Sequence, residues 1–324
     1  MTIETPIALP SPDAPLKIGT RGSPLALAQA HETRDRLAAH FDLPTEAFEV
    51  KVIKTMGDDR AMIAADRPLK EIGNKGLFTR EIEEQLLSGG IDIAVHSMKD
   101  MPTEQPEGLI LDCYLPREDV RDCFISPGHA AIADLPEGTV VGTSSLRRRA
   151  QLLNRRPDLQ VVEFRGNVQT RLKKLEDGVA ACSFLAMAGL NRMNMAGEHM
   201  TPIAPEDMLP AIAQGAIGIE RRISDARVAA MLSAIHDRPT QHRLDAERAF
   251  LATLDGSCET PIAGLALLDG DEIWLRGEIL RPDGSEALKG ERRGPIAEGA
   301  RMGADLAREL LAQAGDGFFD WREG

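Results

Sequence analysis

The sequence predicts an α/β protein in which two similar halves precede a smaller α+β part. Three observations lead to this fold class. Short apolar strands alternate with segments of helical periodicity through most of the chain. The order of apolar strand, glycine turn, hydroxyl residues and helix occurs twice. The C-terminal part instead carries two neighbouring strands before a final helix, as expected for a small α+β domain.

The first half opens with an apolar strand whose end runs into a helix start. Ser23 precedes Pro24 as a helix N-cap precedes the first helical residue. A later strand ends just before Lys99 and Asp100, which are therefore expected at the edge of the sheet. The expected elements of this half are strands at 16–20, 50–54 and 91–95 and helices at 25–40 and 75–87.

The second half repeats this order and leads into the C-terminal part. Strands that alternate with helices predict parallel sheets, with binding sites at the carboxyl ends of the strands. Asp269-Gly270-Asp271 predicts a hairpin between two strands. The expected elements are strands beginning at 140 and spanning 161–164, 262–268 and 272–280, and helices at 146–154, 168–175, 245–254 and 297–314.

Length and composition limit the classes of function. At 324 residues the chain is longer than one typical domain, so two or three domains are expected. The stretch Met1–Pro15 lacks the basic and apolar regions of a signal peptide, and no window is apolar enough to span a membrane. We therefore expect a cytoplasmic protein that has no membrane partner. The net charge of −13 argues against a nucleic-acid partner.

Basic residues gather where loops meet helices. A helix N-terminus offers unpaired N–H groups, and a neighbouring guanidinium adds a bidentate donor for carboxylate or phosphate. The pattern predicts a polyanion site within an acidic protein; the alternative for any single arginine is pairing with a nearby acid on a solvated surface. The residues concerned are Arg21, Lys75, Lys99, Arg147, Arg148, Arg149, Arg165, Arg171 and Arg192.

Several familiar catalytic motifs are absent. Thr143-Ser144-Ser145 has no nucleophile elbow around it, so its hydroxyls are expected to bind an anion rather than attack a carbonyl. Gly73-Asn74-Lys75-Gly76 lacks the spacing of a nucleotide-phosphate loop. Asp100 before Met101-Pro102 suits either a proton-handling carboxylate or an ordinary turn acid, and the pattern alone leaves both open.

The cysteines show no metal-binding or paired redox spacing. Each is first interpreted as a small buried side chain in a protein from a reducing compartment, and no metal is expected. The four are Cys113, Cys123, Cys182 and Cys258.

Taken in order, segments along most of the chain resemble the porphobilinogen deaminase (hydroxymethylbilane synthase) family. They are IGTRGSPLAL at 18–27, GLF at 76–78, DIAVHSMKD at 92–100, VGTSSLRR at 141–148, RGNV at 165–168, QGAIGIE at 214–220, AERAF at 246–250 and GSC at 256–258. The resemblance implies two periplasmic-binding-protein-like α/β domains plus a smaller C-terminal α+β domain. Its expected boundaries are 1–115 with 216–236 for domain 1, 116–215 for domain 2 and 237–324 for domain 3.

The resemblance also implies the reaction and its residues. Four porphobilinogens are expected to condense, with loss of ammonia, into linear hydroxymethylbilane for haem or chlorophyll biosynthesis, on a dipyrromethane primer joined to Cys258 by a thioether. Asp100 is the expected catalytic carboxylate, which stabilises the cation formed as ammonia leaves. The expected cofactor-binding residues are Lys99, Thr143, Ser145, Arg147, Arg148 and Gln214; those for pyrrole side chains are Arg21, Ser23, Arg165, Arg171 and Arg192; Lys75 and Phe78 belong to an expected mobile loop.

The expected partners are porphobilinogen and the growing polypyrrole, bound by a monomer. The alternative is a small-anion or tetrapyrrole-binding module of the same fold without catalysis. Such a module would have no use for Cys258, and an inactive relative would be expected to lose Cys258 or Asp100. The chain departs from the family pattern at Met56, at Ala181-Cys182-Ser183 and at Ala213, where many relatives have glycine, and none of these positions carries an expected chemical role.

Overall fold

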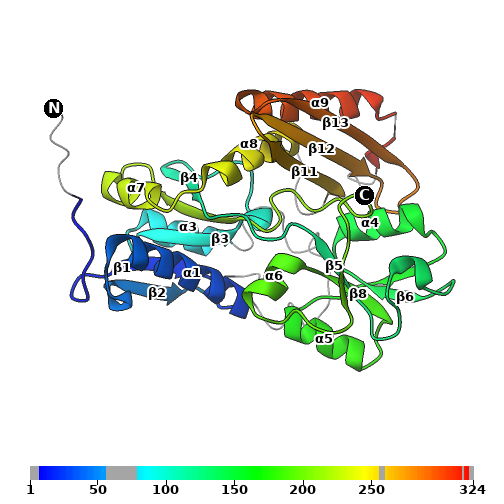
Figure 1. The fold of residues 1–324 in the computed structure, drawn as a ribbon, viewed down its shortest axis with the longest axis horizontal. Helices are drawn as coiled ribbons and strands as arrows, with labels where there is room; N and C mark the ends of the chain where they lie inside the picture. The colour runs from blue at the N-terminus through cyan, green and yellow to red at the C-terminus, as the bar shows by residue number, and fades with distance from the viewer. Residues whose placement is uncertain (1–6, 56–78, 255–259, 316, 321–324) are drawn as a thin grey trace. The chain divides into compact units, whose positions relative to one another are not determined.

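The computed structural model describes residues 7–55, 79–254, 260–315 and 317–320. The chain forms two compact units (Figure 1). The described parts of the first unit lie within Met1–Asp59, Lys75–Arg117 and Ala216–Gln241. Those of the second lie within Glu118–Gly215 and His242–Gly324.

The first unit contains a mixed five-stranded sheet in the order β2-β1-β3-β10-β4. Strand β1 runs parallel to both β2 and β3, whereas β10 runs antiparallel to β3 and β4. The strands are β1 (Leu16–Thr20), β2 (Phe48–Val52), β3 (Ile93–Ser97), β4 (Leu109–Tyr114) and β10 (Ile217–Arg222).

Helices pack against this sheet around a core that includes Ile18, Leu37 and Ile217. The Ser23 side chain caps α1 by accepting a hydrogen bond from Ala26 N at 3.2 Å, as the Ser-Pro pair predicts. The helical segments are α1 (Pro24–Phe41), η1 (Thr45–Ala47), α3 (Arg80–Leu87), η4 (Met98–Asp100) and α7 (Ala226–Ser233).

The second unit begins with a five-stranded sheet in the order β7-β6-β8-β5-β9. Its elements are β5 (Asp122–Ile125), η5 (Ile132–Asp134), β6 (Val140–Gly142), α4 (Leu146–Arg155), β7 (Gln160–Val162), α5 (Val168–Glu176), β8 (Cys182–Ala186), α6 (Met187–Arg192) and β9 (Met200–Pro202). Here β6 is parallel to β7 and β8, and β5 is antiparallel to β8 and β9.

The two five-stranded sheets have the same topology. Strand β6 corresponds to β1, β8 to β3 and β5 to β10, with the same parallel and antiparallel pairings. The loops after β1 and β3 therefore leave the first sheet at one edge, and those after β6, β7 and β8 do so in the second. Most of the sequence-predicted site residues within the described ranges lie in or beside these loops, or at the start of the helix that follows. Gln214 lies in the segment that ends at Gly215, and Arg192 is the last residue of α6.

The C-terminal part of the second unit is a meander of three antiparallel strands covered by helices. Figure 1 shows α9 running along the sheet, and Gly290 and Gly303 permit this packing. A Cβ atom at Gly290 would lie 2.6 Å from Leu306, and one at Gly303 would lie 2.2 Å from the Ala246 carbonyl oxygen. The elements are α8 (Arg238–Thr253), which enters this unit at His242, β11 (Ile262–Asp269), β12 (Glu272–Leu280), β13 (Ala287–Pro295), η6 (Ile296–Glu298) and α9 (Gly299–Gln313).

The fold class predicted from the sequence, two α/β parts and a smaller α+β part, is confirmed. The strand predicted at 50–54 lies at Phe48–Val52, and the helix predicted from 245 begins at Arg238 because Pro239 is tolerated in a first turn. Of the helix predicted at 75–87, only Arg80–Leu87 falls within the described residues. The predicted domain boundaries stay predictions. None of the described helices has the length and apolar composition needed to cross a lipid bilayer.

Candidate active site

A pocket in the first unit brings together three residues predicted from the sequence: Arg21, Ser23 and Asp100. It has a volume of about 80 Å³, and His96 and Thr79 also line it. Arg21 and Ser23 follow β1, and Asp100 follows β3 on η4. Since β1 and β3 are parallel neighbours, both loops leave the sheet at the same edge and enclose the pocket.

A polar contact joins the helix that follows β1 to the end of β3. Gln29 of α1 and Ser97 at the end of β3 exchange hydrogen bonds of 2.9 and 3.0 Å through their side chains, and Gln29 is buried. Ser23 uses a lone pair of its hydroxyl to cap α1, so its hydroxyl proton is available to an acceptor in the pocket. Lys99 lies beside Asp100 on η4 and is half-buried.

In the second unit, the predicted hydroxyl residues organise the start of α4. Thr143 Oγ1 accepts a hydrogen bond from Ser145 N at 3.2 Å. Ser145 Oγ in turn accepts one from Arg148 N at 3.4 Å and caps the helix. These bonds direct the first turn of α4, with Arg147 and Arg148, toward the edge where β5 begins.

Asp122, the first residue of β5, is the common partner of both arginines. Arg147 donates to its carboxylate at 2.7 and 3.2 Å, and Arg148 at 2.7 and 3.0 Å. Gln214 donates a further hydrogen bond at 3.1 Å. All four side chains are at least nine-tenths buried. Burial alone would raise the pKa of the Asp122 carboxyl, but the two guanidinium charges hold it well below its ordinary range.

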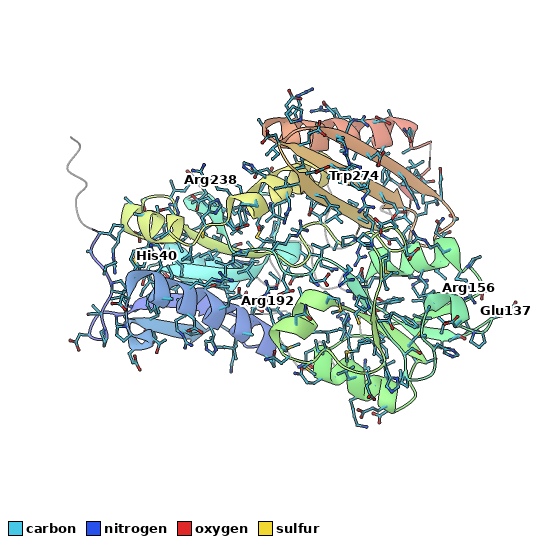
Figure 2. All side chains as sticks on the ribbon, viewed as in Figure 1. His40, Glu137, Arg156, Arg192, Arg238 and Trp274 are labelled. Carbon is cyan, nitrogen blue, oxygen red and sulfur yellow. The ribbon has the colours of Figure 1, made fainter. Side chains whose placement is uncertain are left out.

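The remaining predicted arginines of this unit have few protein partners. Arg171 donates to the Gly166 carbonyl oxygen at 2.9 Å, and burial together with the charge of Arg148 lowers the pKa of Arg171 to about 10. Arg165 is half-buried and makes no hydrogen bond or ion pair with a described residue. Arg192, labelled on α6 in Figure 2, donates to the Gly215 carbonyl oxygen at 3.1 Å.

Three predicted site residues, Lys75, Phe78 and Cys258, lie outside the described residues. Sequence reasoning missed two others, Asp122 and the buried Glu220 of β10. In both cases the available signal was an acidic residue within a short apolar strand, where a charge needs a partner.

Known proteins match the chain over nearly its full length. Residues 16–230 match the family model "Porphobilinogen deaminase, dipyromethane cofactor binding domain", and residues 242–312 match "Porphobilinogen deaminase, C-terminal domain". A porphobilinogen deaminase of Paracoccus denitrificans is 67% identical over 313 residues, covering 97% of this chain and 99% of that protein. The chain belongs to the porphobilinogen deaminase family.

Other porphobilinogen deaminases are also similar. The chloroplastic porphobilinogen deaminase of Pisum sativum is 53% identical over 311 residues, covering 94% of this chain and 83% of that protein. Among solved structures, a putative methionine-binding lipoprotein of Bacillus subtilis aligns with 12% identity and a TM-score of 0.41, over 69% of this chain and 91% of that one.

The activity is therefore that of porphobilinogen deaminases, which are hydroxymethylbilane synthases and belong to the transferases. The substrate is porphobilinogen and the cofactor is dipyrromethane. This assignment does not favour the alternative of a binding module without catalysis.

The described residues of the second unit fit an anionic cofactor. Dipyrromethane carries acetate and propionate groups, which require cationic donors that no protein carboxylate occupies. Arg165 and Arg171 have no acidic partner among the described residues. The Arg147 Nε atom is buried and has no acceptor among them either. Arg147 and Arg148 share the carboxylate of Asp122, so the four guanidiniums of Arg147, Arg148, Arg165 and Arg171 exceed the acidic partners that the described residues give them.

Proposed function

We propose that Asp100 is the catalytic carboxylate of this porphobilinogen deaminase. The observation that supports it is the pocket, where Asp100 lines the same small volume as Arg21 and Ser23. A guanidinium and a hydroxyl donor suit the acetate or propionate of an incoming porphobilinogen. A carboxylate beside them stabilises the positive charge that develops on the pyrrole as ammonia leaves.

We propose that Cys258 carries the dipyrromethane through a thioether. The properties of the other cysteines support this assignment. Cys113, Cys123 and Cys182 are free and buried, and burial raises the pKa of each thiol, to about 12, 11 and 12 respectively. Because the thiolate is the nucleophile, these three are poor attachment sites.

The cofactor's carboxylates are proposed to bind Lys99, Thr143, Ser145, Arg147, Arg148 and Gln214, with Arg21, Ser23, Arg165, Arg171 and Arg192 binding the side chains of added pyrroles. When bound, the cofactor supplies the pyrrole carbon at which chain growth starts. Arg165 and Arg171 then neutralise carboxylates that would otherwise repel one another. Asp122 holds Arg147 and Arg148 in fixed orientations at the start of α4.

Substitution of Asp100 tests the proposed role. Asp100→Asn keeps the shape but removes the charge, and kcat should fall by about 10²–10³-fold. Asp100→Glu, which keeps the charge, should retain more activity. The matched control is Asp112→Asn, because Asp112 pairs with Arg221 in the same unit and does not line the pocket. If Asp100→Asn folds and keeps wild-type turnover, Asp100 has no part in the reaction.

We also propose that the protein is a cytoplasmic monomer with domain 1 at 1–115 and 216–236, domain 2 at 116–215 and domain 3 at 237–324. Free buried thiols are consistent with a reducing compartment. Light scattering of the purified protein tests the oligomeric state, and a dimer mass would reject the monomer.

A further inference from the structure

A buried histidine–carboxylate pair lies directly behind the Asp100 pocket. His96 of β3 lines the pocket, and its Nε2 atom lies 3.1 Å from Glu220 Oε2 of β10. The exposed fraction is 6% for His96 and 0% for Glu220. Residues 96 and 218 are paired in the antiparallel register, so Glu220, two positions beyond 218, lies on the same face of the sheet as His96.

The two ring nitrogens of His96 have different surroundings. Nε2 faces Glu220, whereas Nδ1 makes no hydrogen bond with any described residue. Glu220 cannot donate when ionised, so the pair requires a proton on Nε2. This tautomer leaves the Nδ1 lone pair available on a ring that lines the pocket.

The Glu220 carboxylate has its side-chain hydrogen bond with His96. Its second oxygen, Oε1, is buried without a hydrogen-bond partner among the described residues. A buried carboxylate with so few partners is costly unless a neighbouring group carries compensating charge. A proton taken up by His96 during the reaction would place a positive charge beside Glu220.

Other titratable groups among the described residues lie near this pair. On α3, Glu83 is partly buried, and burial raises the pKa of its carboxyl, with the charge of Glu220 adding to the rise. Arg21 and Asp100 are the other charged residues among the described residues that line the pocket. On α1, the neutral Gln29 contacts Ser97 at the end of β3.

We propose that His96 accepts the proton released at each condensation, and that Glu220 is the positioning residue that fixes its tautomer. This inference rests on the proposed role of the Asp100 pocket. The ammonium of porphobilinogen leaves as ammonia with the electrons of the C–N bond. The acceptor pyrrole of the growing chain forms the new C–C bond and loses its α-proton to His96 Nδ1, and the C–H electrons restore the ring. His96 then passes the proton to ammonia, which leaves as ammonium.

The first test needs no turnover. In a Cys258→Ser protein labelled with ¹⁵N-histidine, the shifts of His96 should report a proton on Nε2 and a bare Nδ1. Adding Glu220→Gln removes the charge that selects this tautomer, and the Nδ1-protonated form should increase. The proposal is contradicted if His96 is already protonated on Nδ1. It is also contradicted if the tautomer of His96 is the same with and without Glu220→Gln.

The second test measures proton transfer. His96→Asn should lower kcat by about 10²-fold with little change in KM. With porphobilinogen deuterated at its free α-carbon, the isotope effect on kcat should rise in His96→Asn above its wild-type value, because removal of that proton becomes slower. The control is His236→Asn, since His236 is a half-buried, hydrogen-bonded histidine of the same unit outside the pocket.

The outcomes separate this inference from the proposed function. If Asp100→Asn is inactive while folded His96→Asn keeps the wild-type isotope effect, the role of His96 is wrong and that of Asp100 stands. If Asp100→Asn stays active, the pocket itself is misassigned. Should His96→Asn fail to fold, Glu220→Gln is measured instead and should raise the same isotope effect; an unchanged value overturns the proposal.

Discussion

Asp122 and Arg147 form a buried ion pair in which Asp122 Oδ2 lies 2.7 Å from Arg147 Nη1, with side-chain exposures of 0% and 5%. Arg148 shares the same carboxylate. Both arginines were expected as cofactor ligands, and the structure gives them a second task, which is to neutralise a buried acid. Their substitution will therefore affect stability as well as turnover, and the two effects must be measured separately.

Asp122→Asn should destabilise the protein by about 3–5 kcal/mol at neutral pH, because it leaves two buried guanidiniums without their counter-charge. The pKa of Asp122 is depressed in the folded state, so its contribution is present above the unfolded value of about 3.9 and is lost as the pH falls further. Urea unfolding between about pH 3 and pH 7 measures this.

The wild-type protein should lose stability over the acid part of that range more steeply than Asp122→Asn does. Asp158→Asn is the control, since Asp158 pairs with Arg156 at the surface and should matter little. Parallel pH profiles for the wild type and Asp122→Asn would contradict the assignment of a charged Asp122.

Arg171→Met should separate binding from stability. The cation is desolvated, is repelled by Arg148 and has no acidic partner among the described residues, so its removal should leave Tm unchanged or higher. Elongation should nevertheless slow, because a carboxylate of the chain loses its partner. Arg148→Met is the matched comparison and should lower Tm, since it disturbs Asp122. A fall in Tm for Arg171→Met equal to that for Arg148→Met would reject this distinction.

Ser23 offers a paired substitution. Ser23→Ala should cost about 1 kcal/mol, because Ala26 N loses its cap acceptor. Ser23→Asp retains an acceptor and should keep the stability, but it adds a negative charge to the pocket that Asp100 lines. We expect KM for porphobilinogen to rise in Ser23→Asp and Tm to fall only in Ser23→Ala. An unchanged KM in Ser23→Asp would argue against substrate carboxylates at this position.

The described thiols should resist alkylation in the folded protein. At about pH 8, Cys113, Cys123 and Cys182 are almost entirely protonated, because burial raises the pKa of each to about 11 or 12. Peptide mapping after iodoacetamide treatment should find these three unmodified until denaturant is added. Rapid labelling of any of them under native conditions would show that the protein around that cysteine opens to solvent.

Local signals were sufficient to predict much of the fold. Leu16–Thr20 and Glu272–Leu280 are apolar or alternating segments bounded by turn residues, and both were predicted with their observed limits. Ser23 and Ser145 mark helix starts through their side-chain caps. Of the pocket residues, Arg21 was predicted as a basic residue where a loop meets a helix, whereas the roles of Ser23 and Asp100 were predicted from the resemblance to porphobilinogen deaminases.

Contacts distant in sequence could not be predicted in the same way. Strand β10 belongs to the first sheet but follows β5–β9 of the second unit in the sequence. The residues of β10 alone do not specify that its neighbours are β3 and β4. His96 and Glu220 are 124 positions apart, and Asp122 is 25 positions from Arg147. Each pair depends on which side chains become buried together, a property of the tertiary packing.

The central claim, that chain growth takes place on a primer carried by Cys258, is tested most directly by intact-protein mass spectrometry. The wild-type protein and Cys258→Ser are compared before and after porphobilinogen is added. We predict a dipyrromethane adduct on the wild type alone, with further increments of one pyrrole when substrate is present. A wild-type mass without the adduct that stays unchanged after porphobilinogen is supplied, or an adduct that persists in Cys258→Ser, would contradict the claim.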